Sequence, residues 1–463
     1  MGKGPKRLVM IVILLVLSWV VHYAWISFPI ISGYNAKQMC SCVFVSGRDQ
    51  KAIDTSDLGE FPLNVASNKV NFTDSSVTAT VLGMAMQNAI YRKGIGCTLI
   101  NDITEEKLRS QVFVIPAPPA VNTDSIAWPS GDKITDSISP RIDKNKLEAA
   151  IAAAFTEPHA GKKQRTRAVL IVYDGQIVGE KYAPGFNKNM KMYGWSMAKS
   201  FTGAMIGILV KENKLDIMKP APVEEWSKPT DPRHAITIQN LLQQTSGLDF
   251  QEVYTKSSDV TRMLFQKGDM AAYAASHTLV HKPGTVFNYS SGNSNILARI
   301  IRQTVGQNDY PAFPFTSLFY KIGMYETNME PDASGTYVGS SYVNATARDY
   351  ARFGLLYCNN GVWNGEQILP ADWVRQTTAP FTADPLKHYG YQFWLSGFDK
   401  DNSAKRKYPD VPSDMFYCDG FGFEMVYIIP SKKLVVVRLG LTLDRSFDEN
   451  DFLKSILVAI DNN

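Results

Sequence analysis

The N-terminal apolar run constrains this chain most, because a stretch so free of charge cannot form part of an ordinary soluble surface. Leu8 to Val21 is apolar apart from Ser18, and the run continues to Ile31 with few polar breaks. A membrane-spanning helix needs about 20 apolar residues, whereas the core of a signal peptide has about 7–15. The run therefore predicts either an uncleaved anchor or a cleaved signal peptide over residues 1–31.

The residues around this run favour export of everything that follows it. Lys3, Lys6 and Arg7 precede the run, and positive charge beside a span stays in the cytoplasm. Trp19 and Trp25 suit the interface of a bilayer, and no good small-x-small cleavage site follows. We expect the body of the chain on the periplasmic or extracytoplasmic side, anchored to the membrane, or secreted if the segment is cleaved.

The charge, the motifs and the cysteines limit the partners, cofactors and disulfides that we expect. The net charge of +4 over 463 residues is small, and no basic block with aromatic residues appears, so nucleic acid is not expected as a partner. No His-rich or acidic cluster has the spacing of metal ligands and no phosphate-binding glycine loop occurs, so we expect neither a metal nor an organic cofactor. The cysteines permit one disulfide, from Cys40 or Cys42 to Cys97.

Residues 32–135 are interpreted as an accessory region that ends in a linker. They contain no recognisable chemical motif. Ser75 to Tyr91 is rich in Ala, Met and Leu and predicts a helix that ends at the glycines after Arg92. Pro116 to Pro119 and Pro129 to Gly131 have the composition of a linker.

Residues 136–463 predict one α+β domain. Asp174-Gly175 between two apolar runs predicts a hairpin, and Phe423 to Ile429 with Leu434 to Leu439 predict a second one. The residues between these hairpins are mostly helical and rich in loops. We therefore expect an antiparallel sheet built from both ends of the region, flanked by a mostly helical subdomain.

The two helices at the ends of this domain have recognisable starts. Asp143 is placed to cap a helix that runs from Lys146 to Phe155. Ser446 and Glu449 have the spacing of a capping box for the last helix.

A serine and a lysine three residues apart are the strongest chemical signal. Ser196 and Lys199 begin an apolar stretch that runs to Val210, with small residues suited to close helix packing. If Ser196 opens this helix, the two side chains share a face and the amine reaches the hydroxyl. Burial there favours the neutral amine, which can accept the serine proton, and the helix N-terminus offers backbone amides to a developing oxyanion.

Spacing alone does not identify a site, because the chain contains a second copy of this pattern. Ser130 and Lys133 lie in the linker, where nothing would bury the lysine. The first copy has further support: Tyr289 stands in a loop of small residues after a Pro-Gly turn, and Ser291 follows it.

Together these motifs resemble the β-lactamase-related serine hydrolases, which include class C β-lactamases, D,D-peptidases, family VIII carboxylesterases and 6-aminohexanoate-dimer hydrolases. Tyr289 and Ser291 match the family's Tyr-x-Asn or Tyr-x-Ser element, and residues 236–248 and 345–354 are similar to two further signatures. The resemblance covers about residues 140–460. It implies a β-lactamase/transpeptidase-like fold, in which Tyr289 is the general acid/base that passes a proton to the leaving group.

The third motif of the family is a strand carrying Lys-Thr-Gly or a His or Trp variant, and here the chain departs from the pattern. The corresponding stretch runs from Tyr417 to Glu424. Gly420 and Gly422 suit a strand edge that a substrate approaches closely. The backbone amides of Ser196 and Phe421 are the expected oxyanion hole.

Asp419 leads to an expectation about the substrate. The basic residue that would hold the carboxylate of a β-lactam is missing, and an aspartate beside Gly420 would repel that carboxylate. We therefore predict a serine hydrolase that forms an acyl-enzyme on a small-molecule or short peptide-like ester or amide, more an esterase or amidase than a β-lactamase. Ser291, Asp419, Gly420 and Gly422 are its predicted pocket residues.

Two alternatives stay open. Gly194 to Ala198 is close to the Gly-x-Ser-x-Gly elbow of Ser-His-Asp hydrolases, but the residues before it are too polar for a buried strand. The candidate histidines, His277, His281 and His388, have no supporting sequence context. The other alternative is a non-catalytic sensor or binding protein that keeps the fold, which the altered third motif suggests.

Overall fold

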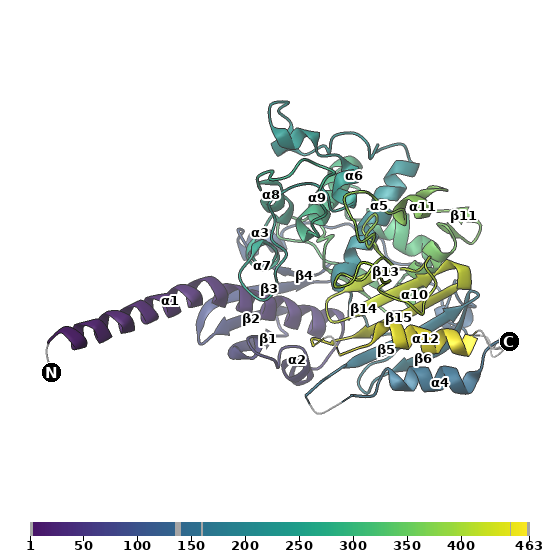
Figure 1. Cartoon of the computed structure of the whole chain (residues 1–463), viewed down its shortest axis with the longest axis horizontal. Helices are drawn as coiled ribbons and strands as arrows, with labels where there is room; N and C mark the ends of the chain where they lie inside the picture. Colours follow the sequence, from purple (N-terminus) through teal and green to yellow (C-terminus); the bar gives the residue numbers. More distant parts are fainter. Residues whose placement is uncertain (1–2, 135–139, 159–160, 445, 461–463) are drawn as a thin grey trace. The chain divides into compact units, whose positions relative to one another are not determined.

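The computed structural model describes residues 3–134, 140–158, 161–444 and 446–460 (Figure 1). The chain divides into two compact units. The N-terminal unit consists of Met1–Gln111, Phe250–Met270 and Asp332–Ser334, and the large unit consists of Val112–Asp249, Ala271–Pro331 and Gly335–Asn463. Two short segments from the middle of the chain thus belong to the N-terminal unit.

A long helix and an antiparallel sheet form the N-terminal unit. The helix is α1 (Lys3–Cys40), and the sheet has the order β1 (Ala66–Asn71), β2 (Ser76–Val81), β3 (Met84–Arg92) and β4 (Gly96–Leu99). Its short helices are α2 (Gln50–Ser56), α3 (Glu105–Arg109) and α7 (Asp259–Gln266). α1 packs against β2, β3 and α7.

The helix predicted from Ser75 to Tyr91 is wrong, because this segment forms β2, a two-residue turn and β3. Val77, Ala79 and Val81 are all fully buried, at every second position of β2. This period of two is the pattern of a strand with one covered face. The many Ala and Met residues concealed the pattern, since both residue types have high helix propensity.

Helix α1 changes character along its length. Its side chains from Leu8 to Val21 are exposed, whereas most of those from Ile31 to Cys40 are buried. The helix is long and apolar enough to cross a membrane. At its buried end, Cys40 forms a disulfide with Cys97 of β4, which is one of the two pairings that the sequence permits. Cys42 is buried and is not part of a disulfide.

Reduction of this disulfide is expected to loosen the N-terminal unit selectively. The bond joins residues 57 positions apart, and closing a loop of this size stabilises a folded state by about 4 kcal/mol in the chain-entropy account. Hydrogen exchange of the full chain, with and without reductant, measures the effect. Amides of β2 and β3 should lose protection by up to about 10³-fold, while those of the sheet of the large unit keep theirs. Equal protection in both states would contradict this prediction.

The large unit is built on a six-stranded antiparallel sheet. Its order is β12 (Trp394–Leu395), β13 (Phe416–Gly420), β14 (Glu424–Ile429), β15 (Leu434–Gly440), β5 (Thr166–Tyr173) and β6 (Gln176–Tyr182). β15 pairs with β5, so the two predicted hairpins join side by side. This confirms the predicted sheet built from both ends of the region.

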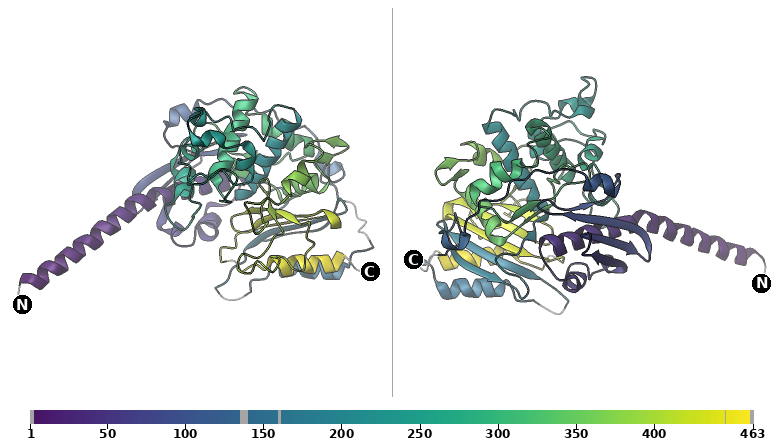
Figure 2. Two further views of the ribbon diagram at one scale, coloured as in Figure 1. Left: turned by 45° about the horizontal axis from the view of Figure 1, so that its top comes forward. Right: turned by 180° about the vertical axis from the view of Figure 1, so that it is seen from behind.

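Helices cover both faces of this sheet. α4 (Lys144–Ala153) and α12 (Glu449–Ile460) pack together on one face, and their apolar residues share a core with alternate residues of the strands. α10 (Ala347–Cys358) lies against β5, β14 and β15. A Cβ on Gly354 of α10 would lie 2.5 Å from a Val435 methyl, on the face opposite to α4 and α12. Figure 2 shows the pair of α4 and α12 along one side of the sheet.

Local signals account for the starts of the two outer helices. Asp143 accepts a hydrogen bond from the Lys146 amide and caps α4, as the sequence predicts. The predicted capping box at Ser446 and Glu449 is wrong. The carboxylate of Asp448 accepts from the Asp451 amide instead, so the cap stands one residue before Glu449, the first residue of α12.

The remaining elements form a mostly helical part beside the sheet (Figure 1). Its helices are α5 (Ala198–Lys211), α6 (Ile238–Leu242), α8 (Met270–Ala275), α9 (Ser291–Val305) and α11 (Trp373–Thr377). A small sheet has the order β7 (Met192–Tyr193), β9 (Val343–Ala345) and β8 (Thr327–Met329), and β10 (Val362–Trp363) pairs with β11 (Glu366–Gln367).

Candidate active site

Ser196 stands between β7 and α5. The expectation that the residues before the serine are too polar for a buried strand is wrong, because Met192 and Tyr193 of β7 are both buried. It lies in a single 3₁₀ turn, Trp195–Met197, which leads directly into α5. The backbone before it is tightly held: Trp195 has a left-handed φ of 46°, and a Cβ on Gly194 would collide with the Tyr350 hydroxyl. A left-handed, non-glycine residue persists only where its surroundings fix it, and such residues gather at functional sites.

Lys199 reaches Ser196 from the first turn of α5. Its Nζ lies 3.0 Å from Ser196 Oγ, 3.0 Å from Ser291 Oγ and 3.1 Å from the carbonyl oxygen of Ser340. The lysine is only 1% exposed. The amine is therefore held beside the serine by two further oxygen atoms from distant parts of the chain.

The second Ser-x-x-Lys pattern has none of this geometry. Lys133 is exposed, and the Ser130 hydroxyl accepts a hydrogen bond from the Asn364 side chain. Burial and partners, rather than spacing, distinguish the two copies.

Tyr289 lies next to the lysine. Lys199 Nζ is 4.8 Å from the centre of the Tyr289 ring, and the ring packs against Trp394 and Tyr389 at centroid distances of 5.2 and 5.8 Å. Ser290 caps α9 by accepting from the Asn293 amide, and Ser291 is the first residue of that helix. The structure thus brings Ser196, Lys199, Tyr289 and Ser291 together.

The loop that carries Tyr289 is fixed by the predicted signature at residues 236–248. The amide of Asn288 donates to the Gln244 carbonyl, and the Ser290 amide donates to the Gln244 side chain. The Gly284 amide donates to the Thr245 carbonyl, where Gly284 itself has a left-handed φ of 81°. Residues after α6 therefore position the tyrosine, although they lie more than forty positions before it.

The strand β13 runs beside the serine turn. A Cβ on Gly420 would collide with the carbonyl oxygen of Gly194, so only glycine allows this approach. The rings of Phe421 and Trp195 are 5.6 Å apart, and Phe421 remains 42% exposed. Gly422, with a φ of 83°, turns the chain back toward β14. This proximity is what the predicted oxyanion hole of Ser196 and Phe421 requires.

Side chains along β13 alternate between its two faces. Cys418 interacts with Ser200 of α5, on the face of Gly420. Burial raises the pKa of Cys418 to about 12, so a neutral thiol occupies the position that matches the lysine of Lys-Thr-Gly. Tyr417 lies on the other face, in the core with α4 and α12, and Asp419 shares that face.

Asp419 lies within electrostatic reach of Lys407. Burial alone would lower the pKa of Lys407, but Tyr417, Glu449 and Asp419 outweigh this effect and raise it. Lys407 Nζ donates to the Tyr417 hydroxyl at 2.9 Å. This positive charge offsets Asp419 and weakens the argument for direct repulsion of a substrate carboxylate. The other argument still holds, because no basic side chain is present at Cys418 to bind a substrate carboxylate. Repulsion of that carboxylate by Asp419 stays a prediction.

His388 has a carboxylate partner that the sequence did not reveal. Its Nδ1 lies 2.6 Å from Asp384 Oδ1, and its ring packs near Phe287 and Trp394. The hydrogen bond described for Ser196 Oγ comes from Lys199, not from this pair. The Asp384–His388 pair instead supports the aromatic residues that contact Tyr289.

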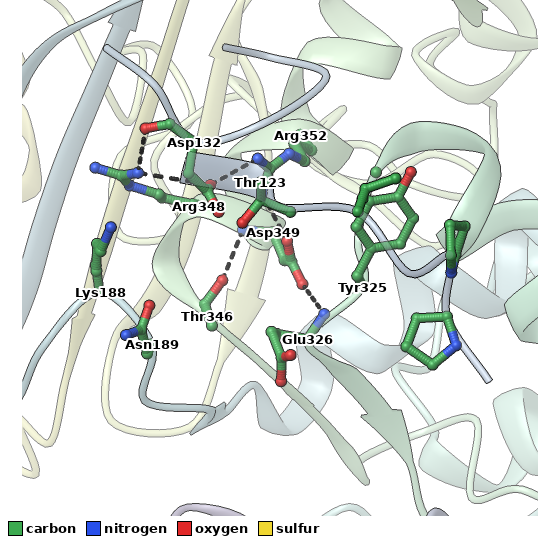
Figure 3. Close-up of a pocket in the computed structure, with 14 residues that line it drawn as sticks. Thr123, Asp132, Lys188, Asn189, Tyr325, Glu326, Thr346, Arg348, Asp349 and Arg352 are labelled. Atoms are coloured by element: carbon green, nitrogen blue, oxygen red, sulfur yellow. Dashed lines mark hydrogen bonds and ion pairs between the residues drawn. The ribbon is translucent and has the colours of Figure 1, made fainter. Parts of the chain in front are cut away.

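The signature at residues 345–354 has a structural explanation of its own (Figure 3). Arg352 donates to the Pro129 and Gly131 carbonyls and to Asp132, and Arg348 pairs with Glu180 at 2.6 Å. Through these contacts the buried arginines of α10 hold the linker residues Pro129 to Asp132 in place. A cavity of about 160 Å³ lies beside them.

Asp349 completes this network. It pairs with Arg352 at 2.8 Å and accepts from the amide of Glu326 and the hydroxyl of Thr327. Burial raises its pKa to about 6, although Arg352 and Thr327 oppose that shift. Neither Ser196, Lys199 nor Tyr289 lines the cavity. Within the described ranges, no cluster of three or more His, Cys, Asp or Glu residues could hold a metal ion.

Comparison with known proteins identifies relatives of this chain. A family model described as Beta-lactamase matches residues 151–454. The 6-aminohexanoate-dimer hydrolase of Paenarthrobacter ureafaciens is 24% identical over 259 residues, which is 51% of this chain and 66% of that protein. Protein flp of Staphylococcus aureus (strain MRSA252) is 31% identical over 139 residues, or 29% of this chain and 27% of that protein. The chain therefore matches only part of each of these relatives.

Solved structures share the architecture. The crystal structure of a family VIII carboxylesterase superposes with a TM-score of 0.53 and 15% identity, covering 72% of this chain and 100% of the other. At this identity the likeness establishes the fold alone.

Proposed function

Because the chain belongs to the beta-lactamase family of serine hydrolases, we propose that it hydrolyses ester or amide substrates through an acyl-enzyme on Ser196. The observation that carries this proposal is the buried amine of Lys199, held 3.0 Å from Ser196 Oγ. A nucleophile and a base within hydrogen-bond reach, with the base oriented by other groups, is the arrangement that covalent catalysis requires. Ser291 Oγ and the Ser340 carbonyl supply that orientation.

The first half of the reaction forms a bond between Ser196 Oγ and the substrate carbonyl carbon. Lys199 accepts the serine proton during this attack, and the carbonyl oxygen takes the negative charge. The amides of Ser196 and Phe421 stabilise this oxyanion. The bond to the leaving group then breaks, as Tyr289 passes a proton to the leaving oxygen or nitrogen. Water then attacks the resulting ester and gives up one proton to the Lys199–Tyr289 pair. The bond from the carbonyl carbon to Ser196 Oγ breaks, the acid leaves, and that proton passes to Oγ and restores the serine hydroxyl.

The surroundings of the serine favour an ester or a linear amide over a β-lactam. The neutral thiol of Cys418 replaces the basic residue that would pair with a substrate carboxylate. Aromatic rings lie near the site instead: Phe421 packs against Trp195, which precedes the serine, and Tyr289 packs against Trp394. The 6-aminohexanoate-dimer hydrolase among its relatives acts, by its name, on the dimer of 6-aminohexanoate.

A substrate panel tests this assignment. p-Nitrophenyl esters, linear amides, D-Ala-D-Ala peptides and nitrocefin are compared on the full chain, with kcat/KM as the measure. Esters or linear amides should be turned over fastest. Faster turnover of nitrocefin would overturn the substrate class. No turnover and no covalent adduct with a fluorophosphonate would favour the non-catalytic binding protein.

Tyr289→Phe is expected to slow turnover while leaving substrate binding nearly unchanged. The substitution keeps the ring that packs on Trp394 and Tyr389, and it removes only the hydroxyl that moves the proton. Loss of a general acid/base lowers kcat by about 10²–10⁴-fold. Steady-state kinetics on an amide substrate measure the change, with Tyr391→Phe as the matched control at a hydroxyl that accepts from Gln239. An unchanged kcat would remove Tyr289 from the mechanism.

Two features support an exported, membrane-anchored protein. The exposed apolar length of α1 suits a bilayer. The Cys40–Cys97 disulfide suits an oxidising compartment. We propose that α1 remains uncleaved, with both units on the extracytoplasmic side.

A further inference from the structure

The turn between β2 and β3 exposes a group of apolar side chains. Leu82 is 74% exposed, Met84 54% and Met86 62%. No charged residue occurs from Ser76 to Tyr91. A small unit seldom leaves three large apolar side chains together in water, so such a patch marks an interaction surface.

Leu82 is also an unusual residue for its position in the turn. Val81 pairs with Met84, so Leu82 and Gly83 form a two-residue hairpin loop, with φ angles of 51° and 73°. Both positions require left-handed backbone, which favours Asn or Asp followed by Gly. The same chain follows this rule at Asp174-Gly175, where the φ angles are 47° and 78°. A leucine here is strained and exposed, so the folded unit alone does not account for it.

The hairpin lies beside α1 at the end of its exposed apolar part. The Ser32 hydroxyl donates to the Ala85 carbonyl, which fixes the start of β3 against the helix. Figure 1 shows β2 and β3 running along α1 where the helix meets the sheet, and the right-hand view of Figure 2 shows this region from behind. Trp25, which is 81% exposed, precedes Ser32 by seven residues, a rise of about 10 Å along a helix.

We propose that Leu82, Met84 and Met86 rest in the headgroup region of the bilayer that α1 crosses, as a second membrane contact of the N-terminal unit. This inference rests on the anchor in the proposed function. If α1 crosses the hydrocarbon core over about 20 residues from Leu8, Ser32 and the hairpin bonded to it lie about 7 Å beyond the core along the helix, at headgroup depth. Uncharged, flexible apolar side chains suit that layer. The turn would hold the N-terminal unit at a fixed rotation about the helix axis.

Site-specific fluorescent labelling in lipid tests the contact. The full chain carries Cys358→Ser, because Cys42 and Cys418 are buried and Cys358 is less so. An environment-sensitive nitrobenzoxadiazole label is placed by Leu82→Cys, by Leu17→Cys within the span, or by Phe72→Cys. Phe72 is the matched control, since it is 70% exposed but lies at the β1–β2 turn, the other end of the same strands. The proteins are reconstituted in phosphatidylcholine vesicles with nitroxide-bearing acyl chains.

The label at Leu82 should shift to shorter emission wavelength and be quenched at least half as strongly as the label at Leu17. The label at Phe72 should behave as in water. Quenching at Leu17 without quenching at Leu82 would overturn the hairpin contact and keep the anchor. Loss of quenching at Leu17 would overturn the anchor itself. A wavelength shift at Leu82 without quenching would mean that protein, not lipid, covers the turn, and would also overturn the proposal.

Leu82→Asn separates this role from folding. Asparagine suits the left-handed position better than leucine, so the thermal stability of the protein should stay the same or rise. With the label moved to Met86→Cys, the substitution should reduce lipid quenching at least twofold. Unchanged quenching with unchanged stability would show that Leu82 does not contribute to the contact.

Discussion

Ser196→Ala is expected to remove the hydrolytic activity, with kcat/KM on p-nitrophenyl esters falling by about 10⁴-fold or more. Without the hydroxyl there is no acyl-enzyme, and the amine of Lys199 then has no proton to accept. Removing one oxygen from a small side chain in a 3₁₀ turn leaves the packing of α5 intact, so the protein should remain folded. Circular dichroism and thermal melting verify this.

Covalent labelling gives the second readout for this variant. A fluorophosphonate probe should modify the wild-type protein at a peptide that contains Ser196 and should leave Ser196→Ala unmodified. Ser130→Ala is the matched control, because Ser130 belongs to the same Ser-x-x-Lys pattern but its lysine is exposed. Ser130→Ala should retain full activity and labelling. Activity of Ser196→Ala above a tenth of wild type would place the nucleophile elsewhere.

Lys199→Met is expected to produce the second largest loss, about 10³-fold or more in kcat/KM. Methionine fills nearly the same buried volume, but it can neither accept the serine proton nor donate to Ser291 Oγ and the Ser340 carbonyl. Unpaired buried acceptors also cost about 1–3 kcal/mol of stability. The activity must therefore be measured below the melting transition of the variant.

The pH dependence of the labelling rate distinguishes a catalytic role of Lys199 from a structural one. If Lys199 is the base, the rate of fluorophosphonate labelling should lose its rise with pH in Lys199→Met, because no group remains to take the serine proton. Lys133→Met, the change at the exposed copy of the pattern, should leave both the rate and its pH dependence unchanged. A parallel loss of rate at every pH, with the profile retained, would assign Lys199 a purely structural role.

Local signals predicted the parts of the fold that local interactions determine. The Asp174-Gly175 turn and the Asp143 cap each depend on neighbours within a few residues, and both predictions are confirmed. The pairing of β5 with β15 was predicted only because hairpins stood at both ends of one region. The segment from Ser75 to Tyr91 was predicted wrongly, because its strands depend on α1 to cover their buried face. The packing of α1 on these strands is a tertiary contact, and the secondary-structure propensity of a segment contains no information about such contacts.

The site residues also divide into those that local sequence predicts and those that depend on distant parts of the chain. Ser196 and Lys199 are three residues apart, and this spacing predicted their contact because an apolar helical stretch follows Ser196, whereas none follows Ser130. Tyr289 came from the resemblance to a family. The Ser340 carbonyl that holds Lys199 is a backbone atom, which no residue type reveals. The direction of Asp419 and its neighbour Lys407 depends on the register of β13 with β14, and a change of register by one residue would reverse it.

The pairing of β5 with β15 has a consequence for biogenesis. These strands meet across more than 260 residues of chain, and contacts between such distant segments form slowly. During synthesis, β5 emerges long before its partner, with an apolar edge that has nothing to pair with. If the chain is exported as proposed, translocation of the unfolded polypeptide can begin before Leu434 has been synthesised. The late strand then delays folding of the large unit until the chain has crossed the membrane.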